Sequence, residues 1–347
     1  MDCDVVIVGG GPAGATAAYF LCGKGLKVIM VERMSDAGFE RYHKICGAGV
    51  NADALKHIPL KDDEILNNVD TLRITWPQGN TINLNIKGYI IDRPKLFLRL
   101  RRESEEKGLK VIRGSVYDVL MMPDAVRTFL NDGTVISSKY VIGADGAYSA
   151  VRKSVFGTTP EIMLKVEEYH SDAKTEQNVL EFVVSEKYDH FYQWYFPYKD
   201  GRCTGAINGF AEDEPNSTRG IRTIPLGWVD PFVKKNVLLI GDAAGFPNCM
   251  TAGGLRTAVL SAEHAAEAIL KDDLGRYEKW WKKNIMSDRR FMKVHDYIAS
   301  CDDAKLSEFS KYMTHKGLWI NGIHSVLHHP KLTWVYIGCL LSLRYGW

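Results

Sequence analysis

The sequence predicts an α/β fold in which a Rossmann-like nucleotide-binding domain is combined with an antiparallel β-sheet domain and a helical C-terminal region. Three observations lead to this expectation. The chain opens with a β-branched run, a glycine-rich turn, an Ala-rich stretch and a second apolar run, which together make a βαβ unit of about 30 residues. Its middle third alternates aromatic with polar residues, as strands with one buried face do. From Gly275 onward the chain has helical character and is unusually aromatic.

The first turn carries the pattern GxGxxG over residues 9–14. In such a turn Gly9 permits the tight bend, Gly11 lets the backbone approach a pyrophosphate, and Gly14 lets the helix pack closely against the strand. The N-terminus of the following helix attracts phosphate groups. Glu32 ends the second strand, where a carboxylate can accept hydrogen bonds from ribose hydroxyls. Pattern and context together predict a dinucleotide cofactor.

Two later turns each deliver an aspartate after an apolar strand. At 140–152 a strand runs into Asp145 and then into a short helix. At 237–245 a strand runs into Asp242, which is followed by small residues that let a ligand come close. Taken singly, each turn is equally well explained as an ordinary strand-to-helix connection.

The three turns in this order resemble the FAD-dependent superfamily that includes aromatic hydroxylases, flavin halogenases and geranylgeranyl reductases. The resemblance implies that FAD is the cofactor. It implies that Asp242 contacts the ribityl or pyrophosphate region, and that Asp145 lies where FAD and any transiently bound pyridine nucleotide meet the protein. It also matches Arg93, the first residue of a helix expected at 93–107, to an arginine that flanks the flavin.

An aromatic segment narrows the resemblance. Residues 192–197 read Tyr-Gln-Trp-Tyr-Phe-Pro and, with Gly201, fit the pattern YxWxFPxxxG of geranylgeranyl reductases. Strand alternation puts Tyr192, Trp194 and Phe196 on one face. From the residues alone, an aromatic core is the simpler explanation. The resemblance implies instead an apolar slot over the flavin that accepts an isoprenoid chain, with Pro197 as a further substrate contact.

Two more segments extend the resemblance. Residues 44–49 look like the K-x-C-G segment of geranylgeranyl reductases, and 248–255 resembles a stretch N-P-x-x-x-G-G-[IL] whose amides lie beside the flavin pyrimidine. In this chain Cys249 replaces the usual proline, and Ala252 stands where glycine is frequent. The family places these segments on opposite sides of one flavin edge. We therefore predict that Cys46 and Cys249 come close together and can form a disulfide.

The predicted activity is saturation of C=C bonds in geranylgeranyl-type isoprenoid chains, of membrane lipids, by hydride transfer from reduced flavin. Such a reaction also needs an acid that supplies a proton. The candidate catalytic residues are Cys46, Tyr192 and Trp194, with Cys46 and Tyr192 as acids, although Cys46 is equally well explained as a buried packing residue. An alternative is a flavin-dependent monooxygenase or halogenase of a small aromatic substrate, although a halogenase would carry WxWxIP at 192–197. A flavoprotein that only carries electrons is a third interpretation.

The remaining expectations concern domains and cofactor contacts. The predicted FAD-binding domain comprises 1–71, 88–160 and 233–275, the substrate-binding sheet comprises 72–87 and 161–232, and the helical region comprises 276–347. Within these, we expect strands at 179–184, 191–196 and 203–210, a loop at 34–51 and a helix at 251–270. The residues predicted to bind FAD are Gly9, Gly11, Pro12, Ala13, Gly14, Glu32, Arg33, Arg41, Cys46, Gly47, Arg93, Val116, Asp145, Gly241, Asp242, Gly253, Gly254 and Leu255.

Composition limits the partners and the location. A net charge of +2 gives no reason to expect a nucleic-acid partner. The seven cysteines include no CxxC pair, so the sequence gives no reason to expect a metal site. The electron donor is expected to be NAD(P)H or a ferredoxin, because only one GxGxxG is present. With no signal peptide and no apolar run of about 20 residues, we expect a cytoplasmic protein. The basic, Trp-containing segment 271–293 suggests contact with the cytoplasmic face of a membrane, although a solvated helix packed on the FAD domain explains it as well.

Overall fold

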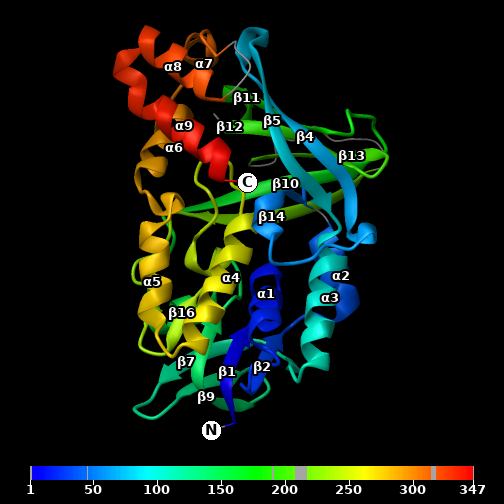
Figure 1. Cartoon of the computed structure of the whole chain (residues 1–347), viewed down its shortest axis with the longest axis vertical. Helices are drawn as coiled ribbons and strands as arrows, with labels where there is room; N and C mark the ends of the chain where they lie inside the picture. Colours follow the sequence, from blue (N-terminus) through cyan, green and yellow to red (C-terminus); the bar gives the residue numbers. More distant parts are fainter. Residues whose placement is uncertain (1, 45, 190, 208–216, 314–317, 347) are drawn as a thin grey trace.

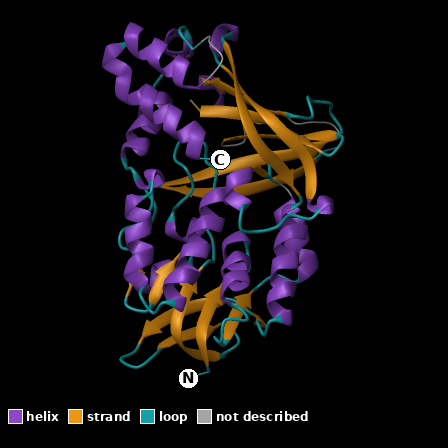
Figure 2. Cartoon of the chain, in the orientation of Figure 1, coloured by secondary structure: helices purple, strands orange, loops and turns teal. Residues whose placement is uncertain are grey.

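The computed structural model describes residues 2–44, 46–189, 191–207, 217–313 and 318–346. Within these residues, two eight-stranded sheets lie toward opposite ends of the molecule. Helices stand between the sheets and continue along one side and over the far end (Figures 1 and 2). The predicted combination of an α/β nucleotide-binding part, a second sheet and a helical C-terminal region is therefore confirmed.

The first sheet is parallel at its centre, where β1 pairs with β2 and β9, and β9 pairs with β16. In spatial order its strands are β15 (Val233–Lys234), β16 (Val237–Leu239), β9 (Val135–Gly143), β1 (Cys3–Val8), β2 (Val28–Glu32) and β6 (Lys110–Arg113), and β8 (Val126–Leu130) and β7 (Val116–Met121) are joined to β9. Parallel strands place their carboxyl ends at one edge, which is where such sheets bind ligands. The residues at that edge are Gly9, Glu32, Asp145 and Asp242.

The second sheet is antiparallel except for one pair, β4 with β11. In spatial order its strands are β14 (Thr218–Leu226), β10 (Ile162–Ser171), β13 (Gly201–Ile207), β12 (Phe191–Tyr198), β11 (Val179–Ser185), β4 (Ile65–Thr75), β5 (Thr81–Ile91) and β3 (Gly49–Asn51). Strands β4 and β5 extend past residues 72–87, the segment assigned to this sheet from the sequence. Of the strand expected at 203–210, residues 208–210 lie outside the described part of the chain.

Nine α-helices occur in the described residues. They are α1 (Pro12–Leu21), α2 (Asp36–Lys44), α3 (Arg93–Glu106), α4 (Leu255–Leu270), α5 (Leu274–Lys283), α6 (Arg290–Ala299), α7 (Asp303–Ser310), α8 (Leu318–His328) and α9 (Thr333–Tyr345). In Figure 2 the helices that Figure 1 labels α1, α3 and α4 stand between the two sheets.

Two expectations about helices were wrong. A loop was expected at 34–51, but α2 forms there because Phe39 and His43, one turn apart, are both buried and their rings lie 4.1 Å apart. The helix expected to begin at residue 251 begins at Leu255. The preceding segment is a loop because the Asn248 side chain accepts hydrogen bonds from the backbone N–H groups of the second and third residues after it.

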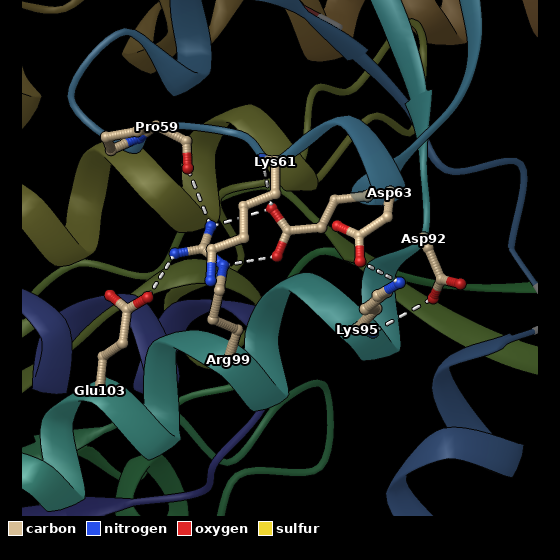
Figure 3. A network of polar contacts seen from close by, with 8 residues as sticks. Pro59, Lys61, Asp63, Asp92, Lys95, Arg99 and Glu103 are labelled. Carbon is tan, nitrogen blue, oxygen red and sulfur yellow. Dashed lines mark hydrogen bonds and ion pairs between the residues drawn. The ribbon is translucent and has the colours of Figure 1, made fainter.

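Helix α3 is held to the turn before β4 by a network of polar contacts (Figure 3). Arg99 donates from Nε and Nη2 to the two carboxylate oxygens of Glu64, at 2.5 and 2.9 Å, and from Nη1 to Glu103 at 2.9 Å. Glu64 is buried, and bidentate pairing satisfies its charge there. The backbone N–H of Asp92 also donates to the Glu64 carbonyl, at 2.8 Å. The network thereby fixes the start of α3, which carries Arg93.

The aromatic residues of the basic segment 271–293 face inward. Trp281 is 1% exposed and stacks on Phe246 with ring centroids 3.6 Å apart, while the Tyr277 hydroxyl donates to the carbonyl of Leu239 at 2.7 Å. Helix α5 therefore packs on the first sheet with these aromatic side chains. No helix in the described residues offers an apolar stretch long enough to reach across a bilayer.

We predict that Trp281→Ala destabilises the protein by roughly 3–5 kcal/mol, because it removes a fully buried indole and leaves a cavity. Chemical denaturation of the variant measures this loss. Trp319→Ala is the control, because Trp319 is 57% exposed and its truncation should change the free energy of unfolding by no more than about 0.5 kcal/mol. Equal losses in the two variants would contradict the packing of α5.

Candidate active site

A cavity of about 610 Å³ lies between the carboxyl edge of the first sheet and one face of the second sheet. Its walls combine the backbone of the three turns with side chains of the second sheet. The contributing segments include 11–13, 31–34, 42–43, 46–49, 144–148 and 251–256, together with residues of strands β10, β11, β12, β13 and β14. A nucleotide site and an apolar face therefore open into the same space.

The three glycines of the GxGxxG pattern in the first turn are required for different structural reasons. Gly9 has a φ of +97°, and a β-carbon there would lie 2.5 Å from the carbonyl oxygen of Ala144. A β-carbon on Gly14 would lie 1.9 Å from the carbonyl oxygen of Gly9. At Gly11 the nearest atom would be in the His43 ring, 3.8 Å away. Packing within the protein explains Gly9 and Gly14, whereas the bare backbone at Gly11 leaves room for a ligand to approach.

Two helices begin at this cavity without a side-chain cap. Helix α1 has Gly11 as its N-cap and α4 has Gly254, and neither helix has an acidic residue in its first turn. Within the described residues no side chain caps their first N–H groups, which can therefore bind a ligand, and the positive ends of both helix dipoles favour negative charge. This arrangement fits a pyrophosphate at α1 and the electron-rich edge of a flavin at α4.

The carboxylates at the strand ends differ in their partners. Glu32 accepts hydrogen bonds from the backbone N–H groups of Gly10 at 2.6 Å and Met34 at 2.7 Å. Asp145 is hydrogen-bonded within its own turn, since it accepts from Ser149 Oγ at 2.6 Å and from the backbone N–H of Ala150 at 2.7 Å. Asp242 makes no side-chain hydrogen bond with the described residues, and burial raises the pKa of its carboxyl to about 6. Of the two aspartates, Asp242 is the one available to a cofactor.

Arg93 lies at the centre of a buried polar cluster. Its Nη2 lies 3.5 Å from Nδ1 of His43, and its Nε has no partner among the described residues. Burial and the positive charges of Arg93 and Arg222 hold the pKa of His43 well below its usual range, so the imidazole is neutral and its Nδ1 can accept. A buried N–H without a partner is costly, and a cofactor atom at this position would satisfy it. The cluster thus fits the flavin that the sequence predicts beside Arg93.

The aromatic face predicted from the sequence is present and lines the cavity. Tyr192, Trp194 and Phe196 project from one side of β12. Trp194 lies over Gly205 of the neighbouring strand, where a β-carbon would come within 2.0 Å of the indole, and Phe196 packs against Gly47, where a β-carbon would come within 2.7 Å. Glycines on adjoining segments therefore provide the space that the aromatic rings occupy.

The loop before α4 is tied to both the sheet and the C-terminal region. The Tyr192 hydroxyl donates to the carbonyl of Thr251 at 2.5 Å. Thr251 Oγ1 donates to the carbonyl of Gly346 at 2.6 Å, and Ser342 Oγ donates to the Asn248 side chain at 2.7 Å. These bonds hold the segment expected beside the flavin pyrimidine between the aromatic face and α9.

Most predicted site residues line the cavity, but four do not. Gly14 is packed against Gly9, and Gly241 is packed against Ala13 and α4. Arg41 is exposed on α2, a helix that the sequence did not predict. Pro197 follows Phe196 directly, so strand alternation turns it to the opposite face. The predicted residues that do line the cavity are Gly9, Gly11, Pro12, Ala13, Glu32, Arg33, Cys46, Gly47, Arg93, Val116, Asp145, Tyr192, Trp194, Phe196, Asp242, Gly253, Gly254 and Leu255.

The predicted disulfide between Cys46 and Cys249 is not formed. Both residues are free cysteines, and only Cys46 lines the cavity. The thiols have different surroundings, because Arg93 and Glu168 act on Cys46 whereas Glu161 and Asp296 act on Cys249. The inference failed because two segments that meet at one cofactor edge need not bring their cysteines together.

Sequence reasoning missed two buried residues of this site, His43 and Glu168. His43 belongs to α2, which was expected to be a loop. Glu168 lies on β10, where it faces the cavity and accepts a hydrogen bond from the backbone N–H of Gly47 at 2.9 Å. A carboxylate in phase with Leu164 and Val166 of one strand was the available signal, because such a position normally carries an apolar side chain.

Comparisons with known proteins agree with this geometry. Residues 2–44 match a family model described as an FAD binding domain. A protein of Methanopyrus kandleri named digeranylgeranylglycerophospholipid reductase 1 is 27% identical over 348 residues, which cover 82% of this chain and 87% of that protein. A protein of Thermoplasma acidophilum named digeranylgeranylglycerophospholipid reductase is 27% identical and covers 88% of each chain.

Solved structures show the same fold. A geranylgeranyl bacteriochlorophyll reductase-like protein of Thermoplasma acidophilum superposes with a TM-score of 0.79 over 98% of this chain and 99% of that chain, at 20% identity. The myxobacterial chondrochloren halogenase superposes with a TM-score of 0.63 over 85% of this chain and 81% of its own, at 19% identity. The predicted resemblance is thus confirmed, and the chain is an FAD-dependent oxidoreductase.

We predict that Gly11→Ala weakens FAD binding by roughly tenfold or more, a change of about 1.4 kcal/mol, without unfolding the protein. The added methyl group meets no protein atom closely but obstructs the approach of the pyrophosphate. Fluorescence titration of the apoprotein with FAD measures the affinity. Gly14→Ala is the comparison, since its β-carbon would clash with the Gly9 carbonyl and should lower the free energy of unfolding instead. Unchanged FAD affinity in Gly11→Ala would show that the pyrophosphate lies elsewhere.

Proposed function

We propose that this chain is an FAD-dependent reductase that saturates C=C bonds in geranylgeranyl-type isoprenoid chains of membrane lipids. The observation that carries the proposal is the joining of a nucleotide site and an aromatic face in one cavity. Relatives named digeranylgeranylglycerophospholipid reductase, which align over more than four-fifths of the chain, support the same substrate class.

The apolar face suits a long hydrocarbon chain better than a small polar ring. Tyr192, Trp194 and Phe196 are joined by Leu180 and Phe182 of β11, and Phe182 contacts Tyr192 and Phe196 edge to face. An isoprenoid segment held against these rings would be shielded from water. When bound and reduced, FAD supplies a hydride to the double bond. The residues of this chain must then align the alkene and provide the proton.

The two acids proposed from the sequence have different surroundings. Burial raises the pKa of the Cys46 thiol, so its proton stays on sulfur at neutral pH. Burial also raises the pKa of the Tyr192 hydroxyl, whose proton is already donated to the carbonyl of Thr251. We propose that Tyr192 and Trp194 position the substrate, and that Cys46 lies close enough to the flavin to affect proton supply.

The electron source belongs to the same proposal. We propose that electrons come from NAD(P)H bound transiently, or from a ferredoxin-type donor. The sequence holds a single GxGxxG, so it contains no second motif for a dedicated nicotinamide domain. Anaerobic mixing of the oxidised enzyme with each donor, followed by the loss of flavin absorbance, separates the two.

We predict that the anaerobically reduced enzyme is reoxidised by a geranylgeranyl lipid and yields a product with fewer double bonds. Trp194→Ala should slow this reoxidation by tenfold or more, about 1.4 kcal/mol, because the alkene loses its main apolar contact. Stopped-flow absorbance and mass spectrometry of the lipid measure the two results.

Val135→Ala, an exposed site outside the cavity, is the control. Absence of reoxidation by every polyprenyl lipid, with oxygen-dependent turnover of a small aromatic instead, would favour the monooxygenase or halogenase alternative.

We also propose that the protein contacts an anionic membrane through an apolar face on α8 and α9. Large apolar side chains at turn-like spacing are 45–73% exposed there, and they are Trp319, Ile320, Ile323, Leu327, Trp334 and Ile337. Residues 309–347 contain no Asp or Glu, while Lys331 and Arg344 are exposed. Apolar and basic groups without acidic ones complement an anionic bilayer surface. The earlier candidate, 271–293, has its aromatic residues packed inward.

We predict that Ile323→Glu together with Leu327→Glu abolishes co-sedimentation with anionic phospholipid vesicles. The two changes put negative charge on the face proposed to enter the lipid surface. Leu270→Glu is the matched control, because Leu270 is 42% exposed at the end of α4, next to the basic segment 271–293. Loss of binding in Leu270→Glu alone would assign the contact to that segment instead.

A further inference from the structure

The cavity contains a buried carboxyl group that the reaction outlined above leaves without a role. Glu168 is 5% exposed and lies on the cavity-facing side of β10, in phase with Val166. The neighbouring Glu167 points to the opposite side, where it forms an ion pair with Arg219. Glu168 forms no ion pair with any described residue, and its one hydrogen bond is the one that Oε1 accepts from Gly47 N–H. An unpaired buried carboxyl is costly to the fold, so it indicates a functional demand.

The sheet register places this carboxyl beside the proposed substrate position. Glu168 pairs with Gly205 of β13, and Gly205 pairs with Trp194 of β12, so the three residues form one row across the cavity face. Because Gly205 has no side chain, the indole of Trp194 lies over it, on the side of Glu168. Gly47 lies close to both Glu168 and Trp194. Its backbone N–H donates to Glu168, and a β-carbon on it would lie 3.4 Å from Trp194 Nε1.

The electrostatic surroundings favour the neutral acid. Burial raises the pKa of Glu168, and the Gly47 N–H and the charges of Arg93 and Arg222 oppose this only in part. Cys46 and Tyr192, which line the same cavity, keep their protons at neutral pH because burial raises the pKa of each. Glu168 therefore differs from these two acids, because its Oε2 carries no hydrogen bond within the described structure and can hold a proton toward the cavity.

We propose that Glu168 is the catalytic acid that protonates the substrate alkene. This inference rests on the proposed reductase function. As the alkene is reduced, one carbon receives a hydride from reduced FAD, which becomes oxidised FAD. The neighbouring carbon receives the proton of the Glu168 O–H bond, and the electron pair of that bond stays on the carboxylate. The carboxylate then regains a proton from water at the cavity mouth, which completes the balance.

The test compares Glu168→Gln with Glu167→Gln in the FAD-loaded enzyme. Glutamine keeps the acceptor for Gly47 N–H and the size of the side chain, but it cannot supply an acidic proton. Glu168→Gln should bind FAD and be reduced normally, while its reoxidation by a geranylgeranyl lipid falls by roughly 10²–10⁴-fold. In the wild type this rate should fall as pH rises through the raised pKa of Glu168, because only the protonated acid is active. Glu167→Gln should retain both the rate and its pH profile.

A second readout does not depend on turnover. Difference infrared spectroscopy of the oxidised enzyme should show, in addition to the signal of Asp242, a protonated-carboxyl C=O band that disappears as pH rises, is absent in Glu168→Gln and persists in Glu167→Gln. Wild-type reoxidation rates in Glu168→Gln, or an unchanged band, would overturn the role of Glu168 and leave the reductase function standing. If no polyprenyl lipid reoxidises the wild type, the proposed function fails, and the acid role fails with it.

Discussion

The close packing of α1 against β1 is the constraint on which the site depends. It requires that residue 14 have no β-carbon, because the Gly9 carbonyl occupies that position. Once α1 is seated, α3 and α4 pack against it, and the three helices begin at the same edge of the first sheet. Their first residues, Pro12, Arg93 and Leu255, all line the cavity. This backbone contact, together with the Arg99–Glu64 network at the start of α3, sets where three positive helix ends converge, which is the surrounding that an anionic dinucleotide needs.

The apolar half of the cavity is made by leaving side chains out. Trp194 lies over the backbone of Gly205, and Phe196 lies against Gly47. A side chain at either of these glycine positions would fill the space that the rings occupy. The missing side chain at Gly205 also leaves space between Trp194 and Glu168. The shape of the apolar half of the cavity and the access to the Glu168 carboxyl therefore have the same cause.

Local patterns were enough to predict the βαβ unit, the aspartate turns and the aromatic strand, because each is determined within a short stretch of chain. Glu32 and Asp242 could be proposed as cofactor contacts for this reason, and both line the cavity. Glu168 and the Gly47 N–H that binds it are 121 positions apart, and no local pattern reports such a contact. Helix α2 was missed because its formation depends on burying Phe39 and His43 against the rest of the protein. The disulfide was wrongly expected, since membership of neighbouring segments says nothing about which way a thiol points.

Two alanines in the cavity wall, Ala48 and Ala252, have φ values of 52° and 48°. This left-handed conformation costs a residue other than glycine about 1 kcal/mol. Both alanines line the cavity, so each methyl group narrows it where glycine would leave a gap. The backbone at these two positions is therefore strained, and the cavity beside it is narrower than it would be with glycine. Exchange of alanine and glycine at these two positions would change the width of the cavity without altering any polar contact of a side chain.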